Sequence, residues 1–452
     1  MISKKEYLRA CILSASLLSG LLIGRVTFAA TITVNSLTDP GRAGICALRD
    51  AITAANSKKA AHGCPAGTGN DQVQFRVSGT IVLASTLPKV TDRQLTITGP
   101  LRVTGPVMIS GGGAVQVMQV ALGARLNLNR LGIANGNNAS TDKGGAIDNE
   151  GTLTLYNTTF SDNSAGGSGG TGFGGAIYNG GTLTVTSTII SNSPSSNNNN
   201  AYGAGIYNEG RLTISNSQIS GSTSGQDGGG IYNDRDRTAT VSKTIFSDDR
   251  VVGYGGAIYN GGTLTVTNST FTGNWTDSGG AGIYNEGKLT VSNSSFSGDN
   301  SGRGQGGAGI ANTGTSSVTD STFSGNIAFC GIACGIGGGI ANDGTMTIAN
   351  STISGNSTNG GGGGIANYGM LAVINTTLIG NVASNQVFSD GGGGGIGNFG
   401  TGTLTVANST FYGNSSDAAG GGNILNGATA SIKNTILAGV GNSSGNCAGT
   451  FT

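Results

Sequence analysis

One short unit recurs eleven times between residues 144 and 426 of this 452-residue chain. Each copy has a glycine-rich core, most often GGAI, GAGI or GGGI, and an asparagine two residues after the isoleucine. Successive isoleucines are 25 to 31 residues apart, at Ile147, Ile177, Ile206, Ile231, Ile258, Ile283, Ile310, Ile340, Ile365, Ile396 and Ile424. Self-similarity at such a period is typical of a solenoid, in which each repeat buries its apolar face against its neighbours.

Each unit contains three short segments in which apolar and polar residues alternate, as in residues 256–260, 263–268 and 269–274. This period of two indicates strands with one buried face. A hairpin meander would not place like residues over one another at a spacing of one unit, whereas a parallel coil does. The sequence therefore predicts an all-β fold, a right-handed parallel β-helix with three short strands per coil.

The predicted coil places the isoleucines and a row of phenylalanines inside. It also stacks one asparagine per coil, at Asn149, Asn179, Asn208, Asn233, Asn260, Asn285, Asn312, Asn342, Asn367, Asn398 and Asn426. We expect the amides of this row to hydrogen-bond along the axis. The same is expected of a second row at the next corner, which comprises Asn157, Asn216, Asn268, Asn293, Asn350, Asn375, Asn408 and Asn434.

The composition alone would also fit a disordered chain, because 85 residues are Gly and only 10% are charged. The regular apolar positions argue against disorder, and the absence of a strict Gly-X-Y period excludes collagen.

Residues 1–29 read as a signal peptide with a basic start, an apolar stretch and small residues before the cleavage site. Its removal leaves 19 basic and 21 acidic residues. A nearly neutral chain lacks the electrostatic footprint of a nucleic-acid-binding protein. No other stretch is long and apolar enough to predict a transmembrane segment in the mature chain. We therefore expect an exported protein that is extracellular or on the cell surface. Association with the outer membrane is one way in which it could be held at the surface.

Residues 30–72 differ from the repeats, and 46–56 have the apolar spacing of a helix. A helix here would cap the open end of the solenoid, and residues 73–142 read as two or three degenerate coils. Export permits disulfides. Cys46 and Cys64 are one candidate pair and Cys330 and Cys334 another, which leaves Cys447 unpaired.

The segment TITVNSLTDP (31–40), with CALRDA (46–51) after it, resembles the CSLREA domain that precedes bacterial β-helices. The repeats, with GGAI and FxxN tetrapeptides such as 271–274, resemble those of polymorphic outer membrane proteins. These resemblances imply a bacterial surface or secreted β-helix. Residues 434–450 resemble the start of a C-terminal anchor, so we expect 143–440 to form the eleven-repeat helix and 441–452 a truncated tail.

The outward row beside the isoleucines is where a β-helix enzyme would carry paired carboxylates for acid–base work or a metal. That row carries tyrosines instead, at Tyr178, Tyr207, Tyr232, Tyr259 and Tyr284. We find no catalytic or metal-ligand constellation and expect no cofactor. The tyrosines could form an exposed ligand-binding stripe for carbohydrate, or a self-stacking row that stabilises the sheet.

Three functions remain open. The first is a non-catalytic adhesive or structural surface protein that binds glycans or a host cell surface. The second is a polysaccharide lyase or hydrolase whose site lies on loops, around Asp234–Arg237 or Asp277. The third is an exported fragment without a function of its own.

Overall fold

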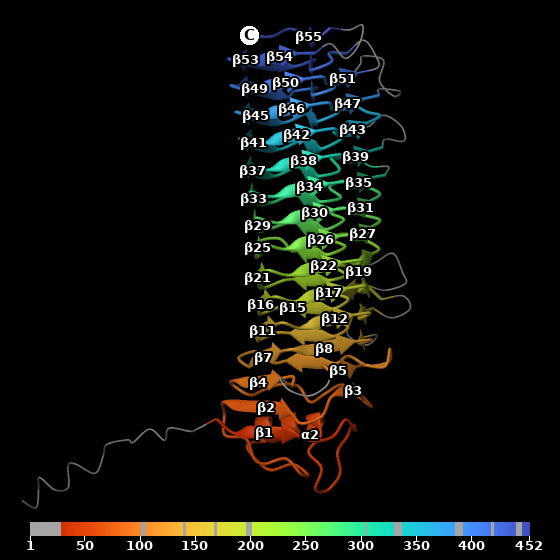
Figure 1. The fold of residues 1–452 in the computed structure, drawn as a ribbon, viewed down its shortest axis with the longest axis vertical. Coiled ribbons are helices and arrows are strands. Elements are labelled where there is room, and N and C mark those ends of the chain that lie inside the picture. The colour runs from red at the N-terminus through yellow and green to blue at the C-terminus, as the bar shows by residue number, and fades with distance from the viewer. Residues whose placement is uncertain are drawn as a thin grey trace, which may run out of the picture.

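In the computed structural model, the chain forms a rod of stacked parallel coils (Figure 1). The structure describes residues 29–100, 105–138, 142–166, 170–195, 201–302, 304, 306–329, 337–384, 392–416, 420–439 and 445–452. The expected signal peptide, save its last residue, and the candidate pair Cys330 and Cys334 lie outside the described residues. The right-handed parallel β-helix predicted from the repeats is confirmed.

Each of the first ten regular coils contains four strands, where the alternation predicted three. In one coil these are β28 (Ile258–Asn260), β29 (Thr263–Thr267), β30 (Thr270–Thr272) and β31 (Trp275–Thr276). Each strand pairs in parallel with the equivalent strand of the next coil, so that Ile258 lies beside Ile283. The expected number of strands was too low because a two-residue strand is too short to show any alternation.

The strands form four long parallel sheets and one short pair. The tyrosine sheet comprises β6 (Met118–Val120), β10 (Ile147–Asn149), β15 (Ile177–Asn179), β20 (Ile206–Asn208), β24 (Ile231–Asn233), β28, β32 (Ile283–Asn285), β36 (Ile310–Asn312), β40 (Ile340–Asn342), β44 (Ile365–Asn367), β48 (Ile396–Asn398), β52 (Ile424–Asn426) and β55 (Cys447–Gly449). The threonine sheet comprises β1 (Thr31–Val34), β2 (Asp71–Phe75), β4 (Leu95–Thr98), β7 (Arg125–Asn129), β11 (Thr152–Tyr156), β16 (Thr182–Thr186), β21 (Arg211–Ser215), β25 (Thr238–Ser242), β29, β33 (Lys288–Ser292), β37 (Thr315–Thr319), β41 (Thr345–Ala349), β45 (Met370–Ile374), β49 (Thr403–Ala407) and β53 (Thr429–Lys433).

The phenylalanine sheet comprises β3 (Gly79–Val82), β5 (Val107–Ser110), β8 (Leu131–Ala134), β12 (Thr159–Ser161), β17 (Ile189–Ser191), β22 (Gln218–Ser220), β26 (Ile245–Ser247), β30, β34 (Ser295–Ser297), β38 (Thr322–Ser324), β42 (Thr352–Ser354), β46 (Thr377–Ile379), β50 (Thr410–Tyr412) and β54 (Ile436–Ala438). The short-strand sheet comprises β9 (Asn137–Asn138), β13 (Ser164–Ala165), β18 (Pro194–Ser195), β23 (Thr223–Ser224), β27 (Arg250–Val251), β31, β35 (Asn300–Ser301), β39 (Ile327–Ala328), β43 (Ser357–Thr358), β47 (Val382–Ala383) and β51 (Ser415–Ser416). β14 (Gly172–Phe173) and β19 (Ala201–Tyr202) form a separate two-stranded sheet.

The core consists of rows of identical side chains that run along the axis. The eleven repeat isoleucines are fully buried, and the rings of Phe246, Phe271, Phe296 and Phe323 stack 4.5–4.9 Å apart. Each such side chain contributes roughly 1.5–3 kcal/mol when it is buried. The rod therefore has a continuous apolar core although the chain as a whole is poor in hydrophobic residues.

The expected amide ladder is confirmed for the first asparagine row. The Nδ2 group of each asparagine donates to Oδ1 of the next at 2.7–2.8 Å, from Asn149 to Asn426 without a break. The row is buried along its whole length.

The same expectation is wrong for the second asparagine row. Asn157 through Asn434 are exposed, and among them only Asn375 donates to Asn350, at 3.3 Å. All eight have φ near +50°, as at Asn268 with φ 51°. Asparagine tolerates this left-handed conformation better than most residues do. These residues therefore form left-handed corners of the backbone, and their amides do not form a ladder.

The N-terminal end of the rod is covered by helix α2 (Leu48–Ser57), which buries Leu48, Ile52 and Ala55. The helix packs against β1 and β2, at the red end of the ribbon in Figure 1. A disulfide joins Cys46, just before the helix, to Cys64 beyond it. At the other end, the free Cys447 belongs to β55, which pairs in parallel with β52.

Candidate functional site

The five repeat tyrosines lie in register on the outer face of the tyrosine sheet. Their rings stack nearly parallel from coil to coil, with centroids 5.7, 5.0, 4.5 and 5.6 Å apart along the row from Tyr178 to Tyr284. Parallel pairing one coil apart brings identical rings within stacking distance, which is the geometry that aromatic pairs favour.

Of the two arrangements that the sequence left open, the tyrosines form the self-stacking row and not the exposed stripe. Tyr178, Tyr207, Tyr259 and Tyr284 are only 2, 9, 5 and 9% exposed, and Tyr232 is partly buried. The rings are covered by a second aromatic layer on the loops that lead into the repeat glycines. Its contacts are Phe173 with Tyr207, Tyr202 with Tyr232, and Tyr254 with Tyr284, at centroid distances of 5.0, 5.2 and 4.3 Å.

This covering layer had a sequence signal, because Phe173, Tyr202 and Tyr254 each stand directly before the first glycine of a repeat. Burial is the main reason why the pKa of Tyr284 rises to about 12 and why the other four tyrosines also have a raised pKa. These phenols stay protonated at neutral pH, and two of them, Tyr178 and Tyr207, donate hydrogen bonds to carboxylates.

An acidic row that the sequence analysis missed accepts these hydrogen bonds. The residue after the ladder asparagine is acidic in five coils, at Glu150, Glu209, Asp234, Glu286 and Asp343. Tyr178 donates from Oη to Glu209, and Tyr207 donates to Oδ2 of Asp234 at 3.4 Å. The recurrence of an acidic residue directly after the ladder asparagine is the sequence pattern that could have predicted this row.

Lys143 lies over the first ring of the stack. Its Nζ donates to Oη of Tyr178 at 2.8 Å, lies 4.1 Å from the ring centroid, and lies 3.7 Å from Oε1 of Glu150. Three carboxylates, Asp148, Glu150 and Glu209, act on the Tyr178 phenol. Lys143 and Lys89 oppose these carboxylates, so this end of the row carries charges of both signs.

Asp148 lies between Gln119 and Tyr178 in the register of the tyrosine sheet. Burial, and then the charge of Glu150, raises the pKa of its carboxyl to about 6. Its Oδ1 atom is buried and has no hydrogen-bond partner among the described residues. This carboxyl is half-protonated near pH 6 and can offer either a donor or an acceptor.

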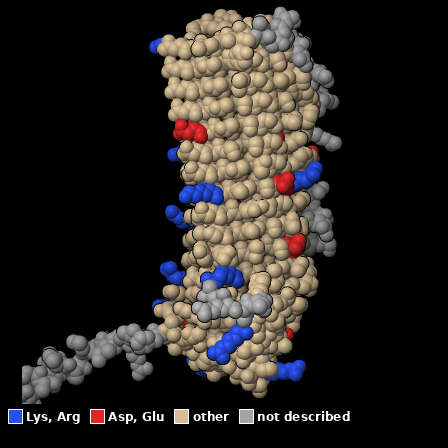
Figure 2. All heavy atoms as spheres, in the orientation of Figure 1, with Lys and Arg blue, Asp and Glu red and all other residues tan. Residues whose placement is uncertain are grey.

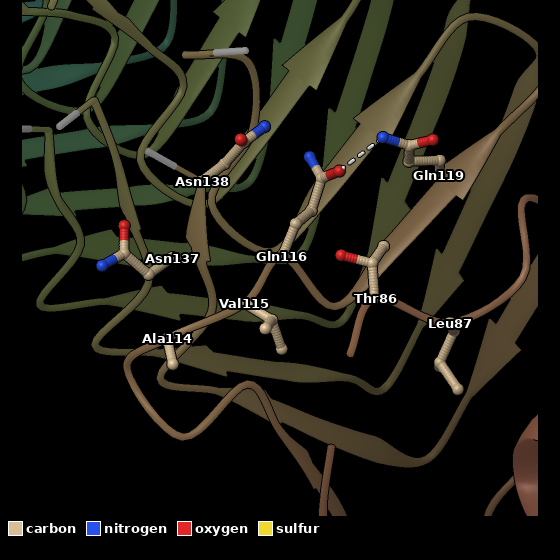
Figure 3. A pocket seen from close by; sticks show the side chains of 8 residues that line it. All are labelled: Thr86, Leu87, Ala114, Val115, Gln116, Gln119, Asn137 and Asn138. Atoms are coloured by element: carbon tan, nitrogen blue, oxygen red, sulfur yellow. Dashed lines mark hydrogen bonds between the residues drawn. The ribbon is translucent and has the colours of Figure 1, made fainter. Parts of the chain in front are cut away.

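A pocket of about 370 Å³ opens beside Gln119 (Figure 3). Four side-chain amides surround it together with one hydroxyl and three apolar side chains, and the lining residues are Thr86, Leu87, Ala114, Val115, Gln116, Gln119, Asn137 and Asn138. Gln119 donates to Oε1 of Gln116 at 2.7 Å, and Gln116 donates to the carbonyls of Lys143 and Gly144 at 2.7 and 2.6 Å. These bonds orient the amides and connect the pocket wall to the loop that carries Lys143.

The two charged loop candidates do not form a site together. Asp234–Arg237 is a turn between the tyrosine and threonine sheets, where Arg235 donates to Glu286 at 3.4 Å on the surface. Asp277 follows β31 and therefore leaves its coil at a different corner. Asp234 follows a strand of the tyrosine sheet, and Asp277 lies on the loop that leads into the next repeat glycines. Among the described residues, neither belongs to a cluster of three or more acidic, histidine or cysteine side chains.

Within the described ranges, no cluster of three or more histidine, cysteine or acidic side chains could hold a metal ion. In the same ranges no helix has the length and apolar character needed to cross a bilayer. Charged side chains are sparse on the face shown in Figure 2, where large areas of the rod carry none.

Comparison with known proteins agrees with the fold. The family model described as "Right handed beta helix region" matches residues 108–296, which include the pocket's Gln116 and all five tyrosines of the row. The chain is thus a right-handed parallel β-helix with an amide-lined pocket at the N-terminal end of its tyrosine row. No curated protein matches the chain, and no solved structure matches it either.

Proposed function

We propose that the protein is a non-catalytic, extracellular or cell-surface β-helix that binds an uncharged glycan. The observation that carries this proposal is the pocket, in which the side-chain amides of Gln116, Gln119, Asn137 and Asn138 converge. Amides donate and accept hydrogen bonds and so match sugar hydroxyl groups in both roles. The apolar side chains of Leu87 and Val115 supply the surface that a sugar ring covers.

Charge does not favour an acidic polysaccharide as the ligand. Asp148, Glu150 and Glu209 act on the N-terminal end of the tyrosine row, and Lys143 and Lys89 oppose them. A uronate therefore finds no clear excess of positive charge there, and a neutral glycan needs none.

The location outside the cell rests on three features. Residues 1–29 have the pattern of a signal peptide, and residues 31–51 resemble the CSLREA domain of exported β-helices. The disulfide between Cys46 and Cys64 fits an oxidising compartment. Detection of the chain in the cell envelope or medium by specific antibody, against a cytoplasmic marker, tests this part of the proposal.

Binding is tested by calorimetry with neutral and uronate oligosaccharides. We expect neutral oligosaccharides to bind and Gln119→Ala to weaken binding at least about tenfold, since lost hydrogen bonds to a neutral partner cost about 1.5 kcal/mol. The matched control is Gln74→Ala, because Gln74 is exposed on the distant threonine sheet. If no neutral glycan binds, or if both variants bind equally well, the pocket is not the site.

A hydrolase is the second candidate, favoured by Asp148. A half-protonated carboxyl with an ionisable neighbour, Glu150, resembles the acid–base pair of a glycosidase in its chemistry. Release of reducing ends from any bound glycan, with loss of this release in Asp148→Asn, would favour the enzyme. Binding without turnover favours the non-catalytic protein.

A further inference from the structure

A second buried polar ladder runs along the opposite wall of the core. It is formed by the last residue of each FxxN segment and its equivalents, all fully buried, namely Asn163, Ser193, Ser222, Asp249, Asn274, Asp299, Asn326, Asn356, Asn381 and Asn414. We call it the FxxN ladder. Two of its members are aspartates, and they flank Asn274 in the middle of the rod.

The asparagines of this ladder use both ends of their amide. Oδ1 of Asn356 accepts from the backbone N–H of Asn326 at 3.0 Å and from its Nδ2 at 2.8 Å. Nδ2 of Asn326 also donates to the carbonyl of Phe296 in the preceding coil, at 3.1 Å. Each of these asparagines thus uses its amide oxygen as an acceptor and its amide nitrogen as a donor.

The aspartates satisfy only the acceptor half of this pattern. Oδ1 of Asp299 accepts from the backbone N–H and from Nδ2 of Asn274, both at 2.9 Å. Oδ1 of Asp249 accepts from the backbone N–H of Ser222 at 2.9 Å. The other oxygen, Oδ2, is buried in both residues without a hydrogen-bond partner among the described residues.

Each Oδ2 atom also lies against a repeat glycine. A Cβ atom built on Gly282 would be 3.2 Å from Oδ2 of Asp299, and one on Gly230 would be 2.9 Å from Oδ2 of Asp249. There is little room for a solvating water between them. An ionised carboxylate would therefore be buried without the solvation or the ion pair that such a charge requires.

We propose that Asp249 and Asp299 are protonated in the folded protein, each acting as a neutral stand-in for a ladder asparagine, and that loss of these protons loosens the middle of the rod. The proton on Oδ2 replaces one amide hydrogen of asparagine and restores the donor that an asparagine supplies at this position. The two sites make the middle coils of the rod sensitive to pH.

The surrounding charges act in the same direction as burial. The charged groups acting on Asp249 are Asp248, at the exposed corner before it, and Asp299. Arg250 follows Asp249 in the chain, but its guanidinium lies over the ring of Trp275, 4.1 Å from the centroid. Among the described residues, the hydrogen-bond partners of Asp299 are uncharged, namely Asn274 and Asn326. Burial is the main cause that raises the pKa of Asp299 to about 8 and that of Asp249 well above its usual range.

The sign of the pH effect follows from linkage. The folded state holds protons that the unfolded state releases above about pH 4, so stability falls as pH rises from there through the folded pKa. For Asp299 the window runs from about pH 4 to about 8. At pH 7 the carboxyl shifts the unfolding equilibrium constant toward unfolding by up to about a thousandfold relative to pH 4.

The test is urea unfolding of the full chain between pH 4 and 9, for wild type, for Asp249→Asn/Asp299→Asn, and for Asp320→Asn. Asp320 is exposed at an equivalent of the second asparagine row and is the matched control. We expect the double variant to be the most stable at pH 8 and to lose most of the wild-type pH slope above pH 6, where Asp148 and Asp227 are already largely ionised. Asp320→Asn should behave as wild type. If the stability of the double variant depends on pH as steeply as that of the wild type, the proposal is wrong.

A direct readout does not depend on stability. The infrared spectrum of the native protein at pH 7 should contain the carbonyl stretch of protonated carboxyl groups. This band should be much weaker in the double variant, because Asp148 and Asp227, whose pKa is about 6, are mostly ionised at pH 7. Asn381→Asp, which places a third acid in the same ladder, should add to the band and steepen the pH slope. A native spectrum without the band shows that both aspartates are ionised and contradicts the proposal.

Discussion

At the scale of the residue, asparagine has two unrelated roles in this protein, and the position in the coil decides which. Asn260 is buried, donates to Oδ1 of Asn285 and accepts from Nδ2 of Asn233. Asn268, eight residues later, is exposed and holds a left-handed backbone corner with φ 51°. The role of Asn260 depends on its side-chain amide, whereas the role of Asn268 depends on its backbone conformation.

We therefore predict opposite substitution patterns at these two asparagines. Asn260→Ala and Asn260→Gly should each cost about 2–4 kcal/mol, because both leave a buried donor and a buried acceptor unpaired. Asn268→Ala should cost about 1–2 kcal/mol through the backbone, and Asn268→Gly almost nothing. Urea unfolding measures all four, and equal costs at the two sites would contradict the distinction.

At the scale of the element, the tyrosine row behaves as a second, outer core. Tyr259 stacks between Tyr232 and Tyr284, at 4.5 and 5.6 Å, and the loops cover the row. A row of this kind holds the loops onto the sheet, because the covering rings of Tyr202 and Tyr254 contact it.

We predict that Tyr259→Ala destabilises the chain by about 2–4 kcal/mol, in the range of large-to-small core substitutions. Tyr412→Ala is the control, since Tyr412 is 57% exposed, and it should change stability by less than about 0.5 kcal/mol. Thermal unfolding followed by circular dichroism measures both. A Tyr259→Ala variant as stable as its control would mean that the row is not a packing element.

The cap is the second element whose contribution can be isolated. The Cys46–Cys64 disulfide closes a loop with a sequence separation of 18, and cross-links of this length contribute about 3 kcal/mol. We expect Cys46→Ala/Cys64→Ala to lower stability by about that amount and to increase amide exchange in α2. Cys447→Ser, which alters a cysteine outside any disulfide, should leave exchange in α2 unchanged.

At the scale of the whole molecule, the rod is a stack in which each coil contacts mainly its neighbours (Figure 1). Stability of such an array is close to a sum of coil and interface terms. Only 10% of the residues are charged, and the ion pairs among the described residues are few. Apolar rows and hydrogen-bond ladders therefore carry the stability.

We predict that the urea midpoint at pH 6 changes little between low salt and about 0.5 M sodium chloride, because screening acts on charges and hardly on apolar burial. Potassium chloride serves as the control for a specific sodium effect. A large fall in the midpoint with either salt would show that ion pairs hold the coils together.

The sequence by itself determined the architecture, because a solenoid repeats one local pattern, and each inward residue meets its own kind one unit later. The isoleucine, phenylalanine and first asparagine rows could be predicted for this reason, and so could the helix of the cap. A two-residue strand such as β31 could not, since it is too short for a pattern.

Only the tertiary structure decided which side chains the loops cover and where a pocket forms. Loops of varying length bring Phe173, Tyr202 and Tyr254 over the tyrosines and bury a row that alternation places on the outside. The pocket joins Thr86, Gln116 and Asn137 from three successive coils of the irregular part. These coils lack the repeat pattern, so the sequence did not predict that the three residues lie together. Sequence periodicity fixes neighbours along the axis, whereas exposure and cavities depend on the loops, which do not repeat.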